Sequence, residues 1–145
     1  MSPISERILR DHGNYRRLLD ILERHVDDVA AGARPDYEMM GDIMHYMAHY
    51  PDMFHHPFED KLFMVLVDID RSAQPLVDDL LAQHQHIAAV GKKLLDDLGA
   101  VVHERLIPWA AMEAEARRYI DSLRAHLHTE ESELIPRAEI GRAHV

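Results

Sequence analysis

Residues 37–67 read YEMMGDIMHYMAHYPDMFHHPFEDKLFMVLV, and this stretch decides the fold. Its apolar residues recur every three or four positions, as they do along one face of a helix. Asp36 stands directly before the stretch as a candidate N-cap, so we expect one helix over the whole of it. Pro51 and Pro57 each lack a backbone donor, which predicts a kink or a short break inside that helix.

Three further helices are predicted on either side of this stretch. The first is opened by Ser2 and Pro3 and closed by Gly32. Another is opened by Ser72 and Pro75 and runs to about residue 99, and the last covers about residues 108–136. No segment alternates with period two for long enough to predict a strand. Four long amphipathic helices with short connections predict an all-α fold, an up-down-up-down antiparallel four-helix bundle.

Composition narrows the classes of partner. The chain has 145 residues, 47% of them hydrophobic, which suits one domain with a real core. Lys and Arg number 16 against 26 Asp and Glu, and the net charge of −10 disfavours nucleic acids and anionic membranes. There is no cysteine, and the longest apolar run, residues 62–67, is too short to span a bilayer. No signal peptide is evident, so we expect a cytoplasmic protein that binds neither nucleic acid nor membrane.

The last six residues, 140–145, read IGRAHV, which is the translation of a widely used sequencing adapter. We therefore expect the domain to comprise residues 1–139, and residues 140–145 to be a non-native tail. His144 carries no weight in the assignment of a site.

The 12 histidines are the unusual feature of the composition. Two strings, HHPFEDKLF from His55 and HLHTEESEL from His126, each hold a His and a Glu four residues apart: His55 with Glu59, and His126 with Glu130. Residues with this spacing lie one turn apart on one helix face, where an imidazole and a carboxylate can converge on a metal ion. Two such pairs alone are weak evidence, because exposed pairs of this kind also support ordinary helices.

The register of these residues makes the evidence stronger. His126 lies 71 residues after His55, and Glu130 lies 71 residues after Glu59. The isolated His84 lies 72 residues after His12. The chain therefore consists of two similar helical hairpins, and a bundle would bring four His and two Glu to one level of its core. At about 100° per residue, these six positions share faces with the apolar residues, which on the second helix are Met40, Met44, Met47, Phe54, Phe58, Leu62 and Leu66. The neighbouring His56, Asp60, His86 and His128 point away from those faces.

Two interpretations of this polar layer differ in their energy. A metal-free core of imidazoles and carboxylates would cost several kcal/mol for each unpaired charge, and bound metal removes that cost. Imidazole and carboxylate ligands without thiolate suit iron, manganese or zinc, and two bridging carboxylates imply two ions. Without metal, we expect the facing carboxylates to bind protons, so that the metal-free fold gains stability as the pH falls.

This pattern resembles that of the hemerythrin-like (HHE cation-binding) family: an isolated His, a His-x3-Glu, a second isolated His and a second His-x3-Glu on four successive helices. The resemblance covers residues from about 1 to 139. It implies a non-haem centre of two iron ions, bridged by carboxylates and an oxo group. The terminal ligands would be His12, His55, His84 and His126, and the bridges Glu59 and Glu130.

One position departs from the oxygen-carrying members of that family, which have a fifth His one turn after the isolated His of the third helix. Here that residue is Ala88. Both irons would then keep an accessible coordination position, which favours reaction with O2, peroxide or nitric oxide over reversible carriage alone. Tyr15 and Tyr119 are candidates for an additional ligand, and the alternative is that they are core tyrosines with hydrogen-bonded hydroxyls.

Three functions follow from the resemblance. The first is binding of, and redox reaction with, a small diatomic or peroxide ligand in the bundle core, with a reductase as partner. The second is a non-catalytic oxygen store or sensor. The third is iron donation for iron–sulfur cluster repair, which in relatives depends on a cysteine-bearing segment. The sequence leaves open whether the protein is an enzyme.

His45, His49 and His56 share one flank of the second helix. This flank is predicted to be either a solvated face or a separate metal site.

Overall fold

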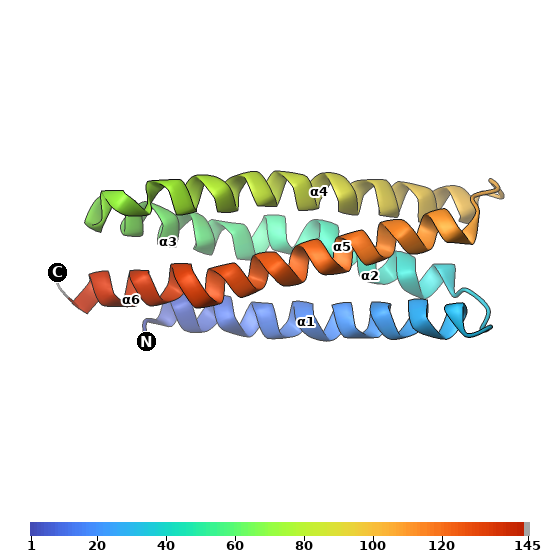
Figure 1. Cartoon of the computed structure of the whole chain (residues 1–145), viewed down its shortest axis with the longest axis horizontal. Helices are drawn as coiled ribbons and strands as arrows, with labels where there is room; N and C mark the ends of the chain where they lie inside the picture. The colour runs from blue at the N-terminus through green and yellow to red at the C-terminus, as the bar shows by residue number, and fades with distance from the viewer. Residues whose placement is uncertain (144–145) are drawn as a thin grey trace.

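The structure is a computed structural model that describes residues 1–143. Its helices form four long rods, and each rod runs antiparallel to the one before it (Figure 1). Within the described residues there is no strand. The predicted up-down-up-down four-helix bundle is confirmed. In chain order the elements are α1 (Pro3–Ala30), α2 (Tyr37–Tyr50), the π-helix η1 (Pro51–His55), α3 (His56–Ile69), the 3-10 helix η2 (Arg71–Ala73), α4 (Gln74–Val102), α5 (Trp109–Thr129), the π-helix η3 (Glu130–Leu134) and α6 (Ile135–Ala143).

The predicted helix starts follow from local hydrogen bonds. The Ser2 hydroxyl accepts a bond from the Ser5 amide (3.1 Å), and the Asp36 carboxylate accepts one from the Met39 amide (3.0 Å). His25 also has a structural role, because its Nε2 accepts the Asp36 amide at 2.8 Å and ties α1 to the start of α2. The caps thus place the ends of the first two rods as the sequence indicates.

The short break predicted at Pro51 and Pro57 is the π-helix η1, whereas the end predicted near Pro136 is wrong. We expected the last helix to end near Pro136, but the chain continues through this residue as α6. The second and the last rod instead each contain one wide π turn, in which the amides of His56 and Ile135 bond to carbonyls five residues back. A proline ring clashes with the carbonyl four residues before it, and for both Pro57 and Pro136 that carbonyl lies inside the π turn. Widening the turn accommodates the ring without ending the rod.

The π turn also explains one error in the predicted core. Phe54 was placed on the buried face of the second helix, yet its side chain is 46% exposed. It lies within η1, where the extra residue per turn rotates the following side chains relative to an ideal α-helix. Met40, Met44, Met47, Leu62 and Leu66 are buried as predicted, and Phe58 is half-buried.

The core consists of two apolar clusters with a polar layer between them. One cluster extends from Tyr15 and Leu19 toward the interhelical loops. The other contains Ile8, Leu62 and Leu134, near the end where the two termini lie (Figure 1). His12, between Ile8 and Tyr15 on α1, is fully buried. The polar layer is therefore sealed from water along the bundle axis on both sides.

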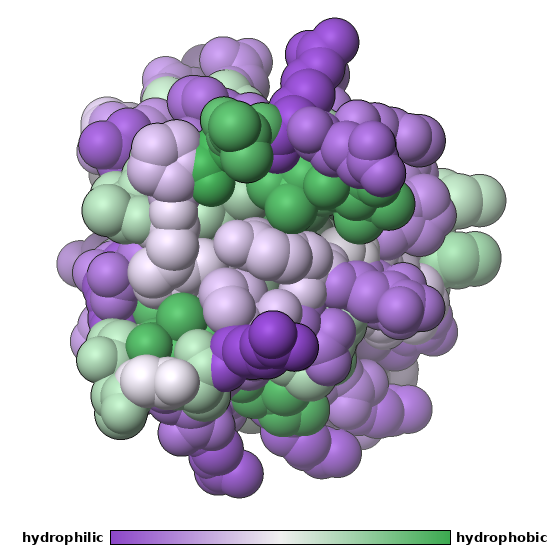
Figure 2. Space-filling view, turned by 90° about the vertical axis from the view of Figure 1, so that its right-hand side faces the viewer, coloured by the Kyte–Doolittle hydropathy of each residue, from purple (hydrophilic) through white to green (hydrophobic). Residues whose placement is uncertain are grey.

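The bundle end that carries the interhelical loops has a mixed surface. Figure 2 shows apolar patches there that are separated by polar residues. At the opposite end, residues 140–143 continue α6, and Gly141 lies close to the Ile69 side chain. His144 lies outside the described residues, and the assignment of residues 140–145 to a non-native tail stays a prediction.

Candidate metal centre

The first half of the bundle brings three of the predicted residues together. His12 comes from α1, His55 from the end of η1 and Glu59 from α3, and all three are buried. The Nε2 atom of His55 lies 3.1 Å from Glu59 Oε1, and that of His12 lies 3.9 Å from Glu59 Oε2. One ligand atom from each residue falls within 4.8 Å of the others, so the three could hold one metal ion.

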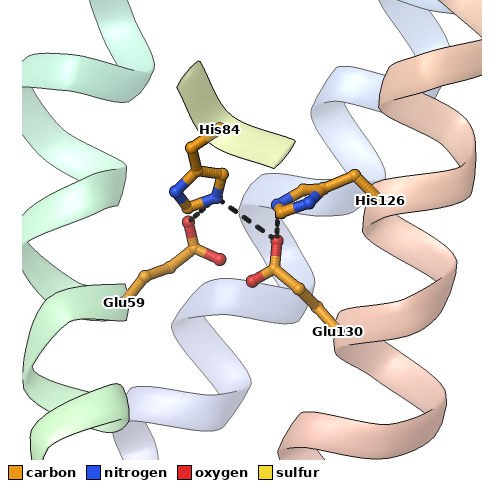
Figure 3. Close-up of side chains that lie close together, drawn as sticks. All are labelled: Glu59, His84, His126 and Glu130. Atoms are coloured by element: carbon orange, nitrogen blue, oxygen red, sulfur yellow. Dashed lines mark ion pairs between the residues drawn. The ribbon is translucent and has the colours of Figure 1, made fainter. Parts of the chain in front are cut away.

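The second half adds a group that includes the same Glu59. His84 from α4 faces Glu59 and Glu130, at 3.4 and 3.8 Å from its Nε2 (Figure 3). The Nε2 of His126 contacts Glu130 Oε1, one turn further along the last rod (Figure 3). Ligand atoms of these four residues also lie within 4.8 Å of one another. Because Glu59 belongs to both groups, all six predicted residues form one continuous cluster.

Unpaired polar atoms test whether this cluster suits metal ions. The buried side-chain atoms without a hydrogen-bond partner include both ring nitrogens of His12, Nε2 of His126 and the carboxylate oxygens of Glu59 and Glu130. Buried polar atoms normally have partners, and leaving them unpaired costs free energy. Nitrogen and carboxylate donors that face one another across a buried layer are the donor set that a divalent or trivalent cation would satisfy. The residues present therefore fit metal ions.

Two hydrogen bonds hold the imidazoles from behind. Nδ1 of His55 donates to Asp11 Oδ2 at 3.0 Å, and Nδ1 of His126 donates to Gln83 Oε1 at 2.8 Å. With Nδ1 used in this way, Nε2 of each ring is free to face the carboxylates. Metal-binding histidines commonly have such a partner, which fixes their tautomer and orientation.

We did not predict these two partners from the sequence, although a signal was present. Asp11 directly precedes His12, and Gln83 directly precedes His84. In both hairpins, the residue before the isolated His accepts the hydrogen bond from the His of the His-x3-Glu pair. The two hairpins are therefore alike in their supporting contacts as well as in their candidate ligands.

The electrostatics of the cluster differ from the expectation for facing carboxylates. Burial alone would raise the pKa of Glu59, but the imidazoles of His12 and His55 beside it hold that pKa well below its usual range. The expected protonation of Glu59 is therefore wrong. Burial lowers the pKa of His126 to about 3 and also lowers that of His84. The pKa of His55 is raised, because Glu59 and Asp11 outweigh the burial of its ring.

Tyr15 and Tyr119 both border the cluster. Tyr15 is buried with its ring edge-on to His55 at 5.2 Å between centroids, and its hydroxyl has no hydrogen-bond partner. Tyr15 is thus a core tyrosine, as the alternative has it, but its hydroxyl is not hydrogen-bonded within the described residues. Burial raises the pKa of both phenols. The role of either tyrosine as an additional ligand stays a prediction.

The other histidines separate from the cluster. His45 and His49 are exposed, and their rings contact each other at a tilt, with 4.3 Å between ring centroids. His56 is half-buried and stacks on the outer side of the His84 ring at 4.7 Å. The predicted orientation of His86 and His128 is confirmed, since both are exposed. Among the described residues, these histidines belong to no group of side chains that could hold a metal ion.

A cavity of about 410 Å³ lies beside the cluster. Glu59, His84, His126 and Glu130 border it, whereas His12 does not. Ala88, the position of the fifth His in oxygen-carrying relatives, is exposed and lines the cavity.

No described helix combines the length and the apolar character that crossing a membrane requires.

Comparison with known proteins gives one family. The hemerythrin HHE cation binding domain matches residues 4–138, which include all six residues of the cluster. No curated protein and no solved structure matches the chain.

Proposed function

The chain belongs to the hemerythrin HHE cation-binding family, and from this premise we propose that it binds two iron ions in the polar layer of its bundle. The observation that carries the proposal is the position of Glu59, which belongs to both groups of candidate ligand atoms. His12 and His55 would hold one ion, and His84 and His126 the other, with Glu59 and Glu130 as the bridging carboxylates. The family is defined by cation binding in general. That the cations are iron, and that each chain binds two of them, is proposed here.

We propose further that this centre binds and reacts with O2, peroxide or nitric oxide. A bound iron pair supplies the redox chemistry, and a reductase would return it to the reduced state. The chain supports such chemistry in two ways. The apolar clusters on either side seal the layer from water along the bundle axis, and Asp11 and Gln83 keep two imidazoles oriented. Ala88 leaves one side of the layer open to ligands.

Two experiments test this function. Protein purified with iron available is expected to contain about two iron atoms per chain, with the ultraviolet absorption of an oxo-bridged diferric pair. One tightly bound ion, or zinc alone when iron is in excess, would reject the two-iron centre. Stopped-flow mixing of reduced protein with O2 then separates an enzyme from a store. Irreversible oxidation supports the reactive centre, whereas a stable adduct released under vacuum would identify an oxygen store or sensor.

A further inference from the structure

The cavity beside the cluster opens between two helices. Its exposed lining residues are His49 on α2 and Ala88, Lys92 and Asp96 on α4. Its inner end is formed by buried residues of the cluster, among them Glu59. The cavity thus connects solvent with the second group of candidate ligands.

The walls between mouth and inner end are apolar. Met44 and Met47 come from α2, Ile87 from α4, and Leu123 and Leu127 from α5, and all are buried in the protein core. Methionine side chains are flexible and polarisable, so such a wall adapts to organic molecules of different shapes. A mostly apolar cavity with a few converging polar groups at one end has the usual composition of a small-molecule site.

Two of the residues that line the cavity on α4 are smaller than their counterparts on α1. At the 72-residue offset that relates His12 to His84, Ala88 corresponds to Arg16 and Gly91 to Leu19. A methyl group at Gly91 would lie 2.8 Å from Tyr119 Cε1 and 3.6 Å from Met44 Cε. Gly91 therefore lets the Tyr119 ring pack directly against α4 as part of the cavity wall, and Ala88 places only a methyl group at the mouth where α1 carries a long side chain.

The volume is far larger than a diatomic ligand needs. An apolar cavity of about 150 Å³ can hold benzene, so about 410 Å³ has room for a molecule of roughly ten to fifteen heavy atoms. At the mouth, Lys92 and Asp96 form an ion pair at 2.8 Å, so neither offers an unpaired charge to a ligand. The apolar walls disfavour any charged ligand.

We propose that this cavity binds a neutral, largely apolar organic molecule with one polar end group, which faces Glu59, His84 and His126. The proposal rests on the proposed function, because the polar end would lie at the same centre. It assigns to this chain a second ligand that is larger than O2, peroxide or nitric oxide.

The test uses 2-phenyl-2-propanol, a neutral tertiary alcohol of about ten heavy atoms, and the full chain loaded with redox-inert Zn(II). Carbon-13-labelled methionine methyl groups report binding by NMR, and saturable shifts are expected at Met44 and Met47. Ala88→Leu would narrow the mouth and is expected to weaken binding at least about tenfold. Ala89→Leu is the matched control, because Ala89 is equally exposed but does not line the cavity.

The outcomes separate this proposal from the proposed function. If the wild-type chain takes up two metal ions but gives no saturable shift, the cavity proposal fails and the metal centre stands. Equal weakening by the two alanine substitutions also overturns the cavity proposal. If the alcohol binds with the expected shifts while the iron-grown protein contains no iron, the cavity proposal stands and the proposed function fails.

Discussion

Asp11 provides the sharpest test of how the protein supports its centre. Its carboxylate accepts the Nδ1 proton of His55 at 3.0 Å, and both side chains are almost fully buried. Asp11→Asn keeps the shape and an acceptor oxygen but removes the charge. A hydrogen bond to a charged group contributes about 1.5–3 kcal/mol, roughly twice a neutral one. Arg7, 3.7 Å from the same carboxylate, is 37% exposed in its side chain and can turn to water.

The expected result is a loss of metal affinity with the fold retained. Because Asn keeps a neutral hydrogen bond worth roughly half as much as the charged one, the loss is about 0.8–1.5 kcal/mol, which weakens metal binding roughly 4–12-fold. The measurement is a titration of Asp11→Asn against a competing chelator, with circular dichroism to confirm the helical fold. Because Gln83 supports His126 with a neutral amide, Gln83→Leu is expected to weaken binding less than Asp11→Leu, which removes a charged acceptor.

Asp42→Asn is the control, since it removes one charge from an exposed position on α2. It should bind metal like the wild type. If Asp11→Asn binds metal within twofold of the wild type, the hydrogen bond to His55 does not support a ligand. If Asp42→Asn weakens binding as much as Asp11→Asn does, the effect comes from net charge rather than from the contact.

Three more predictions follow from the cluster. Glu59→Ala is expected to abolish the binding of both metal ions, while Asp60→Ala, at an exposed site, leaves it intact; the reverse would mean that η1 turns Asp60 inward. His84→Ala should lose metal in elemental analysis and His86→Ala should not, and equal losses would contradict the assigned face of α4. The metal-free protein should lose stability as the pH falls below about 6.5, because the folded pKa of His126 is about 3 and the unfolded chain binds the proton first. At pH 5 the loss is about 2 kcal/mol for this group, and melting curves that do not change between pH 6.5 and 5 would refute it.

The positions of the six cluster residues could be predicted because they depend on helix periodicity and on the repeat between hairpins. On the last rod, the helix before Glu130 is regular, so Ile120, Leu123, Leu127 and His126 are all buried as predicted. The same holds for α1, where His12 lies between Ile8 and Tyr15. A regular helix carries the face of one turn into the next, and therefore residue spacing is enough.

The π turns lay beyond prediction because periodicity assumes a constant number of residues per turn. Phe54 was misplaced for this reason, and the end predicted near Pro136 was wrong because a wide turn can accommodate the ring. Side-chain partners such as Gln83 depend on which helices become neighbours, which spacing within one helix does not give. Wide turns at both His-x3-Glu segments agree with the general occurrence of π-helical turns near functional sites.

The two halves of the centre should differ, because some residues at matching positions of the two hairpins are not alike. Their candidate ligands match, but Asp11 supports the first half with a charge where Gln83 supports the second with a neutral amide. Glu131 lies 3.7 Å from His12 and is held by Arg16, whereas the position matching Arg16 is Ala88, at the open cavity. A negative charge near a metal ion favours its higher oxidation state, because it offsets the added positive charge. We therefore expect the first half to favour the more oxidised ion, while ligands reach the centre through the second half.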